Sequence, residues 1–321
     1  MHVLFGLIAA ACLIITSSAA TAQEFPNRTI RVIVPLTPAS GADIAGRIVA
    51  RYMSENWNQP VFVENRPGAG GQIGTQVVVK SPPDGYTLMI QSASHAANSA
   101  IYKSLPYDPL KELIDVALLG VTPYVLVTSP TGPYKTLKDL IAAAKADPGN
   151  IPFASAGMGS STHLAAEYFI DIAGVKMLHV PYKGSPEAIQ DTIAGRTAFY
   201  MAPINTAAQL VQEGQLRGLG VSSRQKADVL PNILPLAEQG ITEYDVSLWF
   251  GMWAPTGTPP AVVQKLNVEV ARVLQVADVK EQFRKLGIDP KTMPPDEFAQ
   301  FVRKEMAIYK RIVQQAGIQP H

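Results

Sequence analysis

Short apolar, β-branched segments alternate with longer amphipathic segments along most of the chain. Residues 30–35 form the first short segment, and residues 43–57 then carry apolar side chains at helical spacing. The same alternation continues, with further strands predicted at residues 86–90, 124–128 and 151–154 and further helices at residues 137–145 and 161–172. The pattern predicts the α/β class, with largely parallel sheets whose loops at the strand C-termini meet at a shared crevice.

The last part of the chain, residues 259–317, is predicted to be mostly helical. One Pro-Pro pair precedes a helix expected at residues 261–274, and a second pair precedes a helix expected at residues 298–316. Asp296 is predicted to cap this second helix by accepting an unpaired backbone N–H. Because neither a short repeat nor a low-complexity linker interrupts the chain, the sequence predicts two domains joined by strands.

The first 22 residues contain no Lys, Arg, Asp or Glu, and an apolar run is followed there by small residues. The segment ends in Ala20-Thr21-Ala22, which predicts a secretory signal peptide over residues 1–22, cleaved before Gln23. The protein is therefore expected in the periplasm. The only cysteine, Cys12, lies in this segment, so the remaining 321 − 22 = 299 residues offer no thiol for disulfides, catalysis or metal binding.

Composition and charge exclude several classes of function. The net charge is +1 and charged residues make up 17% of the chain without forming a basic stripe, so nucleic-acid binding is not expected. No apolar run after the signal peptide is long enough to span a bilayer. The sequence therefore predicts an exported globular protein with enough residues for two cores.

The glycine-rich run at residues 63–74 follows an apolar segment, a setting in which bare backbone N–H groups can hold a phosphate. A dinucleotide fingerprint that starts at Gly68 needs its third glycine at the position of Ile73, but the glycine comes one residue later, at Gly74. A Walker loop needs Gly-Lys-Ser/Thr, which the run lacks. It is therefore interpreted as a structural turn, with its Glu and Arg paired locally, and no nucleotide cofactor is expected.

A second loop, residues 155–163, is rich in hydroxyl groups and ends in a histidine. One alternative is a serine hydrolase, although no G-x-S-x-G motif is present. Its candidate nucleophiles are Ser155, Ser160 and Ser161. Metal binding is not expected: His163 and Glu167 are four residues apart on a predicted helix, but the other histidines add no ligand spacing.

Anion capture without catalysis is another interpretation of this loop and of residues 35–43, each of which joins a strand to a helix. Exposed backbone N–H groups, hydroxyls and the positive end of a helix dipole favour a carboxylate or phosphate there. One loop per domain would hold the two ends of a small dianion. The alternative for each loop is an ordinary capped helix start, in which Ser40 or Asp43 serves the backbone.

Seven motifs occur in order along residues 25–318: IRVIVP at 30–35, VENRPGAGG at 63–71, PDGYTL at 83–88, LPYDP at 105–109, SAG at 155–157, HVPYKG at 179–184 and APTGTPP at 254–260. With them the chain resembles the extracytoplasmic solute receptors of the Bug/TctC type, the binding proteins of tripartite tricarboxylate transporters. So many motifs in the right order make the match specific.

The resemblance implies a two-lobed periplasmic-binding-protein fold, type II-like, with two sheets that carry helices on both faces and two crossing strands as hinge. Lobe one would take residues 23–120 and 250–321, and lobe two residues 121–249. The resemblance also implies a receptor rather than an enzyme, monomeric and without cofactor. It would bind a small carboxylate and pass it to the membrane subunits of a tripartite tricarboxylate-type transporter or to a sensor protein.

The family's ligand loops fall on two regions of each lobe, and the role of Lys183 beyond orienting a loop stays open. The ligand-binding residues implied by position are Pro38, Ala39, Ser40, Asp43, Ser92, Ser94, His95, Ser155, Ala156, Gly157, Ser160, Ser161, Ala202 and Pro203.

Two departures from the family pattern bear on the ligand. Thr37-Pro38-Ala39-Ser40 stands where the family commonly has Pro-Pro-Gly-Gly, which adds a hydroxyl and removes backbone freedom. Many members carry Asp at the position of Ala202, where a carboxylate would suit a ligand ammonium. Its absence predicts an aliphatic or aromatic mono- or dicarboxylate without an amino group.

Overall fold

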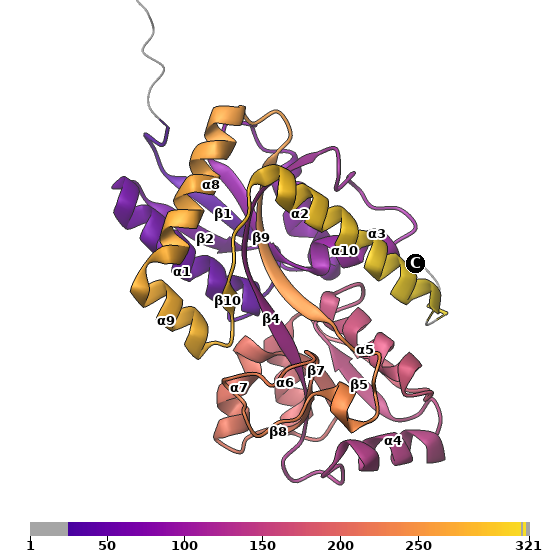
Figure 1. Cartoon of the computed structure of the whole chain (residues 1–321). Coiled ribbons are helices and arrows are strands. Elements are labelled where there is room, and N and C mark those ends of the chain that lie inside the picture. The colour runs from indigo at the N-terminus through magenta and orange to yellow at the C-terminus, as the bar shows by residue number, and fades with distance from the viewer. Residues whose placement is uncertain (1–24, 316, 319–321) are drawn as a thin grey trace, which may run out of the picture.

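Residues 25–315 and 317–318 are described by the computed structural model, in which they form two lobes stacked end to end (Figure 1). The strands are β1 (Ile30–Val34), β2 (Val61–Asn65), β3 (Thr87–Ser92), β4 (Leu113–Thr128), β5 (Pro152–Ser155), β6 (Leu178–Pro181), β7 (Phe199–Pro203), β8 (Arg217–Val221), β9 (Ser247–Pro255) and β10 (Asp289–Pro290). The helices are α1 (Gly41–Trp57), α2 (Gln72–Val79), α3 (Ser94–Ile101), α4 (Leu137–Ala146), α5 (Ser161–Ile172), α6 (Ser185–Ile193), α7 (Ile204–Gln212), α8 (Pro260–Gln275), α9 (Ala277–Lys285) and α10 (Pro295–Gln315), with 3-10 helices η1 (Ala69–Gly71) and η2 (Leu236–Gln239).

The strands follow the order β2-β1-β3-β9-β4-β7-β5-β6 across the molecule, with β8 and β10 also pairing with β4. We call the part built on β1–β3 with α1–α3 and α8–α10 lobe one, and the part built on β5–β8 with α4–α7 lobe two. In lobe one, β1 is parallel to β2 and β3; in lobe two, β5 is parallel to β6 and β7. The predicted parallel α/β architecture is therefore confirmed in both lobes.

Two long antiparallel strands, β4 and β9, run from one lobe to the other (Figure 1). β9 pairs with β3 of lobe one and with β4 up to the register Pro123↔Ser247. From Tyr124 onward, β4 pairs instead with β7 and β8 of lobe two. The register between β4 and β9 shifts twice, and such irregularities bend and twist a strand pair. These are the two crossing strands that the resemblance implied.

Helix α10 packs on this strand pair from lobe one. Trp249 and Trp253 of β9 are buried, and their indole N–H groups donate to Glu305 Oε2 at 2.9 Å and to Asp115 Oδ1 at 2.8 Å. The edge of Phe298 on α10 meets the Trp249 ring, with the centroids 6.0 Å apart. Burial raises the pKa of both the Glu305 and the Asp115 carboxyl. The C-terminal helix thus fixes the hinge strands to lobe one.

Some predicted boundaries were wrong. Residues 124–128 are not a separate strand but the end of the 16-residue β4, because the apolar pattern continues without a turn through the hinge. α10 begins at Pro295, so Asp296 is not its N-cap and lies in the first turn, where its carboxylate still faces the positive end of the dipole. The predicted signal peptide lies outside the described residues. Among the helices that the structure describes, none is long and apolar enough to cross a membrane.

Candidate functional site

A small cavity lies between the lobes, beside the hinge. Its walls are formed by Leu36, Ser40, Gly41, Ala42, Ser92, Ser94, Ala156, Ser160, Ser161, Thr162, Ser185, Pro203, Leu248 and Phe250. The space open to water inside it is about 20 Å³, enough for about one water molecule. The lobes are therefore nearly shut on each other in this conformation.

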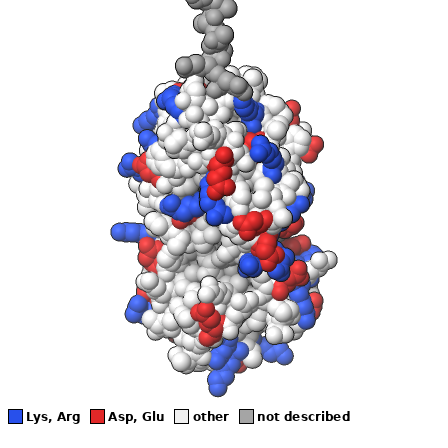
Figure 2. Space-filling model, turned by 90° about the vertical axis from the view of Figure 1, so that its left-hand side faces the viewer, with Lys and Arg blue, Asp and Glu red and all other residues white. Residues whose placement is uncertain are grey.

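Five helices begin at this cavity. α1, α3, α5 and α6 start at wall residues, and α7 starts directly after the wall residue Pro203. The first turn of a helix has unpaired backbone N–H groups and the positive end of the dipole. Among the described wall residues none is charged, so these N-termini are the source of positive potential in the cavity. On the face drawn in Figure 2, the hollow between the lobes is likewise mostly uncharged, and charged side chains gather along its upper edge.

Ser40 and Ser160 cap the two helices that the sequence analysis singled out. Ser40 Oγ accepts from the Asp43 amide at 3.4 Å, and Ser160 Oγ accepts from the His163 amide at 3.2 Å. A hydroxyl that accepts from the backbone keeps its own hydrogen for donation. The capping role therefore leaves the Ser40 hydroxyl able to donate to an anion in the cavity. Ser160 Oγ also lies 3.0 Å from Thr162 Oγ1, and either of these two hydroxyls can be the donor.

Hydroxyls and amides from the two lobes meet directly across the cavity. The Ser161 amide of lobe two donates to Ser94 Oγ of lobe one at 3.0 Å, and the two hydroxyl oxygens lie 3.4 Å apart. Ser92 Oγ donates to Ser94 Oγ at 3.0 Å. On another side, Asn205 Nδ2 of lobe two donates to the Gly41 carbonyl of lobe one at 3.3 Å. These contacts join the lobes in the closed conformation.

Asp43 supports the loop at residues 35–43 and does not line the cavity wall. Its buried carboxylate accepts from the Ala39 amide at 2.9 Å, from Arg47 Nε at 3.0 Å and from Asn65 Nδ2 at 2.9 Å. Ala39 itself has a φ of 61°, a conformation that suits glycine better than alanine. Pro38 and Ala39 are exposed and do not line the cavity. Because the Asp43 carboxylate binds the Ala39 amide, it stabilises the conformation of this loop.

Ser155 lies next to a histidine and is not a wall residue of the cavity, although its chain neighbour Ala156 is. Its fully buried hydroxyl is 2.6 Å from His179 Nε2 and also accepts from the Gly157 amide at 3.1 Å. The His179 ring stacks on His163 with the centroids 3.9 Å apart. Neither Ser155 nor Gly157 lines the cavity. The contacts of Ser155 with His179 and with the Gly157 amide stabilise the start of the loop at residues 155–163. Ser160 Oγ accepts from the His163 amide, and the Ser161 amide and hydroxyl contact the Ser94 hydroxyl.

His95 and Ala202, two further residues of the expected set, lie outside the cavity wall, and Lys183, whose role was left open, lies outside it as well. His95 is buried on α3 against Trp253, with ring centroids 4.5 Å apart, and burial lowers its pKa to about 3. Ala202 is buried in β7 opposite Val125, although its neighbour Pro203 does line the cavity. Lys183 is exposed. The contact of these residues with a ligand stays a prediction.

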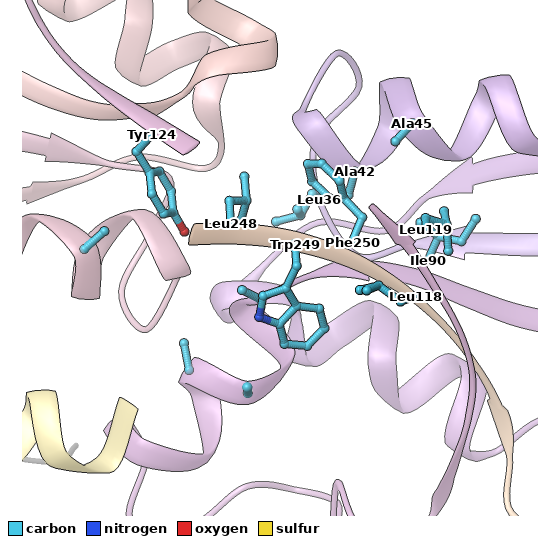
Figure 3. Close-up of a cluster of buried hydrophobic side chains, with 14 of the residues drawn as sticks. Leu36, Ala42, Ala45, Ile90, Leu118, Leu119, Tyr124, Leu248, Trp249 and Phe250 are labelled. Carbon is cyan, nitrogen blue, oxygen red and sulfur yellow. The ribbon is translucent and has the colours of Figure 1, made fainter. Parts of the chain in front are cut away.

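Several wall residues escaped the sequence analysis, and two of them belong to the hinge. Leu248 and Phe250 lie on one side of β9, while the Trp249 ring points to the other side (Figure 3). Thr162, which belongs to the anion-capture loop predicted at residues 155–163, also lines the cavity. Ser185 lines it too and was missed; it begins α6 in the same way that Ser161 begins α5. The signal for Ser185 was available: a glycine followed by a serine and a proline opens a helix there.

The glycine-rich run reaches the second lobe as well as forming a turn. The predicted local pair is confirmed, since Arg66 and Glu64 form an ion pair. The Gly70 carbonyl accepts from Asn98 Nδ2 at 3.1 Å, and a Cβ at Gly70 would lie 2.7 Å from the Met158 carbonyl oxygen in lobe two. The run therefore includes a point of close approach between the lobes.

Two α/β lobes joined by crossing strands, with helix N-termini around an interlobe cavity, define a periplasmic solute-binding protein. The family model described as "Tripartite tricarboxylate transporter family receptor" matches residues 45–318. The chain therefore belongs to this receptor family, TctC, whose members bind solutes and are not enzymes.

Relatives and solved structures agree with this assignment. The chain is 36% identical to protein BugT of Bordetella pertussis, with 92% of each chain covered. It is 35% identical to a UPF0065 protein in the tcbD-tcbE intergenic region of Pseudomonas sp. (strain P51), covering 96% of this chain and 93% of that one. Among solved structures, R. palustris Rpa4515 with adipate superposes with a TM-score of 0.89 at 30% identity, covering 92% of this chain and 100% of that one. MatC of Rhodopseudomonas palustris with bound malate has a TM-score of 0.86 at 30% identity, with 90% and 100% covered.

Proposed function

We propose that this protein is an extracytoplasmic receptor that captures a small mono- or dicarboxylate without an amino group and delivers it to a tripartite tricarboxylate-type transporter. The observation that carries the proposal is the convergence of five helix N-termini on a cavity with uncharged walls. Backbone N–H groups and hydroxyls at such a site bind an oxyanion without a basic side chain. Export by the segment 1–22 and a monomeric state belong to the same proposal.

The solved neighbours support a carboxylate ligand, since one holds adipate and another holds malate. The uncharged wall supports the absence of an amino group, because an ammonium in the cavity would meet no carboxylate among the described wall residues. We also propose the division into residues 23–120 plus 250–321 and residues 121–249. The pairing of β4 supports this division, because β4 pairs with β9 up to Pro123 and with β7 from Tyr124 onward.

The geometry gives a simple cycle of capture. A space of about 20 Å³ does not hold a carboxylate, so the ligand enters a more open form and takes the place of direct contacts such as Ser94–Ser161. Contacts to helix N-termini of both lobes then favour the closed population. The transporter would recognise the surfaces that closure brings together.

A thermal-shift screen followed by calorimetry tests the proposal. The chain without residues 1–22 is titrated with succinate, malate, adipate and benzoate, and with aspartate and glutamate as amino-substituted controls. A ligand at a hundredfold excess over its Kd stabilises the folded state by about 2.7 kcal/mol. At least one unsubstituted carboxylate is expected to raise the Tm and to bind near micromolar Kd, about −8 kcal/mol. No response to any carboxylate, or tighter binding of aspartate than of succinate, would contradict the proposal.

A further inference from the structure

The hinge strand β9 supplies an apolar surface to the ligand cavity. Alternate residues of a strand point to the same side, and Leu248 and Phe250 both reach the cavity wall. Trp249 between them points to α10 and donates to Glu305. Figure 3 shows the side chains of Leu248 and Phe250 on the side of β9 that faces Leu36 and Ala42 of lobe one. All four are wall residues and all are buried.

This apolar surface lies directly beside the anion-binding groups. A Cβ added to Gly41, the first residue of α1, would lie 3.0 Å from Phe250 Cζ, so the tip of the ring touches the start of that helix. Pro203 adds a further apolar wall residue from lobe two, at the start of α7. A carboxylate bound at these helix starts therefore has its attached carbon atoms against hydrocarbon side chains.

We propose that Leu248 and Phe250, together with Leu36, select carboxylates whose carbon chain or ring carries no hydroxyl or amino substituent. This inference rests on the proposed function and deepens it. The helix N-termini bind the carboxylate, and the apolar surface formed by Leu36, Leu248 and Phe250 contacts the hydrocarbon part of the ligand. The side chains of Leu36, Leu248 and Phe250 have no hydrogen-bonding atom, so a hydroxyl lying against them loses its water without gaining a partner.

The expected discrimination is moderate and measurable. A hydrophobic wall rejects an otherwise matching molecule that carries one extra hydroxyl by up to about 100-fold. Each methylene that the wall removes from water strengthens binding about fourfold. Affinity should therefore rise along a series of unsubstituted carboxylates until the cavity is filled, and it should fall by about 10- to 100-fold when a hydroxyl is added.

Calorimetric titration of matched pairs tests the inference. Succinate is compared with malate, and 3-phenylpropionate with 3-phenyllactate, because the members of each pair differ by one hydroxyl. For whichever pair binds, the unsubstituted acid is expected to bind at least tenfold more tightly. Leu248→Ser places a hydroxyl in the wall and is expected to reduce this ratio to below about threefold. Leu248→Met keeps a hydrocarbon surface and is the matched control, which should retain the ratio.

Each outcome bears on a different statement. If the hydroxylated acids bind as tightly as their partners, or if Leu248→Ser leaves the ratio unchanged, the inference is overturned while the carboxylate receptor stands. If no carboxylate of any kind binds, the proposed function fails and this inference fails with it. A ratio of tenfold or more in the wild-type chain that collapses in Leu248→Ser and persists in Leu248→Met supports it. The ratio of affinities for the unsubstituted and the hydroxylated acid is measured on the wild-type chain. The inference can therefore be tested even if Leu248→Ser does not fold.

Discussion

The phenol of Tyr102 in lobe one donates a hydrogen bond to the main-chain carbonyl of Met158 in lobe two, with 2.9 Å between the oxygens. The two residues are 56 positions apart in the sequence, and neither lines the ligand cavity. The Tyr102 ring also covers Gly159, where a Cβ would lie 2.6 Å from Cε2. The contact joins the two lobes in this closed conformation.

Replacing Tyr102 by Phe removes this hydrogen bond and keeps the ring. One such bond contributes about 0.5–1.5 kcal/mol, here to the closed form alone. Tyr102→Phe is therefore expected to weaken the binding of every ligand by the same factor, about two- to tenfold. Calorimetry with two different carboxylates measures it. A loss confined to one of the two ligands would show that Tyr102 acts on specificity instead.

Gly70 and Gly174 provide a matched pair for testing the glycine-rich run. Both have a φ of 63°, so an alanine at either position carries a similar backbone cost, about 1–2 kcal/mol. A Cβ at Gly70 meets the Met158 carbonyl oxygen at 2.7 Å, whereas a Cβ at Gly174 meets nothing within 4 Å. Gly70→Ala is expected to hinder closure and weaken ligand binding tenfold or more; Gly174→Ala should lower stability alone. Equal ligand affinities in the two variants would refute the role of Gly70.

Trp249 is expected to report closure by its fluorescence. It lies in the hinge strand β9, is 1% exposed, and donates to Glu305 on α10. Trp249 pairs with Val121, three residues before β4 changes its pairing to lobe two at Tyr124, so rotation of the lobes about the hinge is expected to change the packing around the indole. We expect a ligand-dependent change in emission that Trp249→Phe abolishes and that a substitution of the distant Trp57 preserves. A signal that persists in Trp249→Phe would place its origin elsewhere.

His95 makes the fold sensitive to acid. Its pKa in the folded state is lowered from 6.5 to about 3 because the ring is buried. Below pH 6.5 the unfolded chain binds a proton that the folded chain does not, so the free energy of unfolding falls as the pH falls towards 3. The loss is about 1.4 kcal/mol per pH unit for this one proton. In His95→Gln the contribution of this proton to the pH dependence of the free energy of unfolding should vanish. Urea unfolding of both proteins at pH 7, 6 and 5 measures it. Carboxyl groups contribute equally in both proteins, so identical slopes would contradict the assignment.

Local patterns in the sequence predicted the α/β architecture and the two loops, residues 35–43 and 155–163, that lead into helices at the cavity. The alternation of short apolar and amphipathic segments is enough to identify parallel α/β lobes, because each strand and its crossover helix are set by neighbouring residues. Ser40 and Ser160 were recognisable because capping depends on the next three positions. The capped helix start is confirmed for both loops, and each capping serine also lines the cavity. Anion capture by the same loops stays a prediction.

The local sequence did not predict that Leu248 and Phe250 of β9 line the cavity, and it did not predict the contacts between the lobes. In β9 the residues from Leu248 to Pro255 are all buried, so no alternation shows which side faces the cavity. The contact of Tyr102 with Met158 depends on how the two lobes meet, which no segment specifies alone. The family resemblance implied that His95 contacts the ligand, and that contact stays a prediction. The burial of its ring against Trp253 depends on packing between distant segments, which the local sequence does not specify.

The uncharged walls of the cavity also govern how a solute arrives. With a net charge of +1 and no charged wall residue among those described, the protein exerts little long-range attraction on an anion. Encounter is then left to ordinary diffusion, and dissolved salt changes its rate little. The enclosed helix N-termini act after arrival, where counterions have little access. Discrimination among solutes therefore resides in how long each one stays, and a receptor of this kind sorts its ligands by their rates of escape.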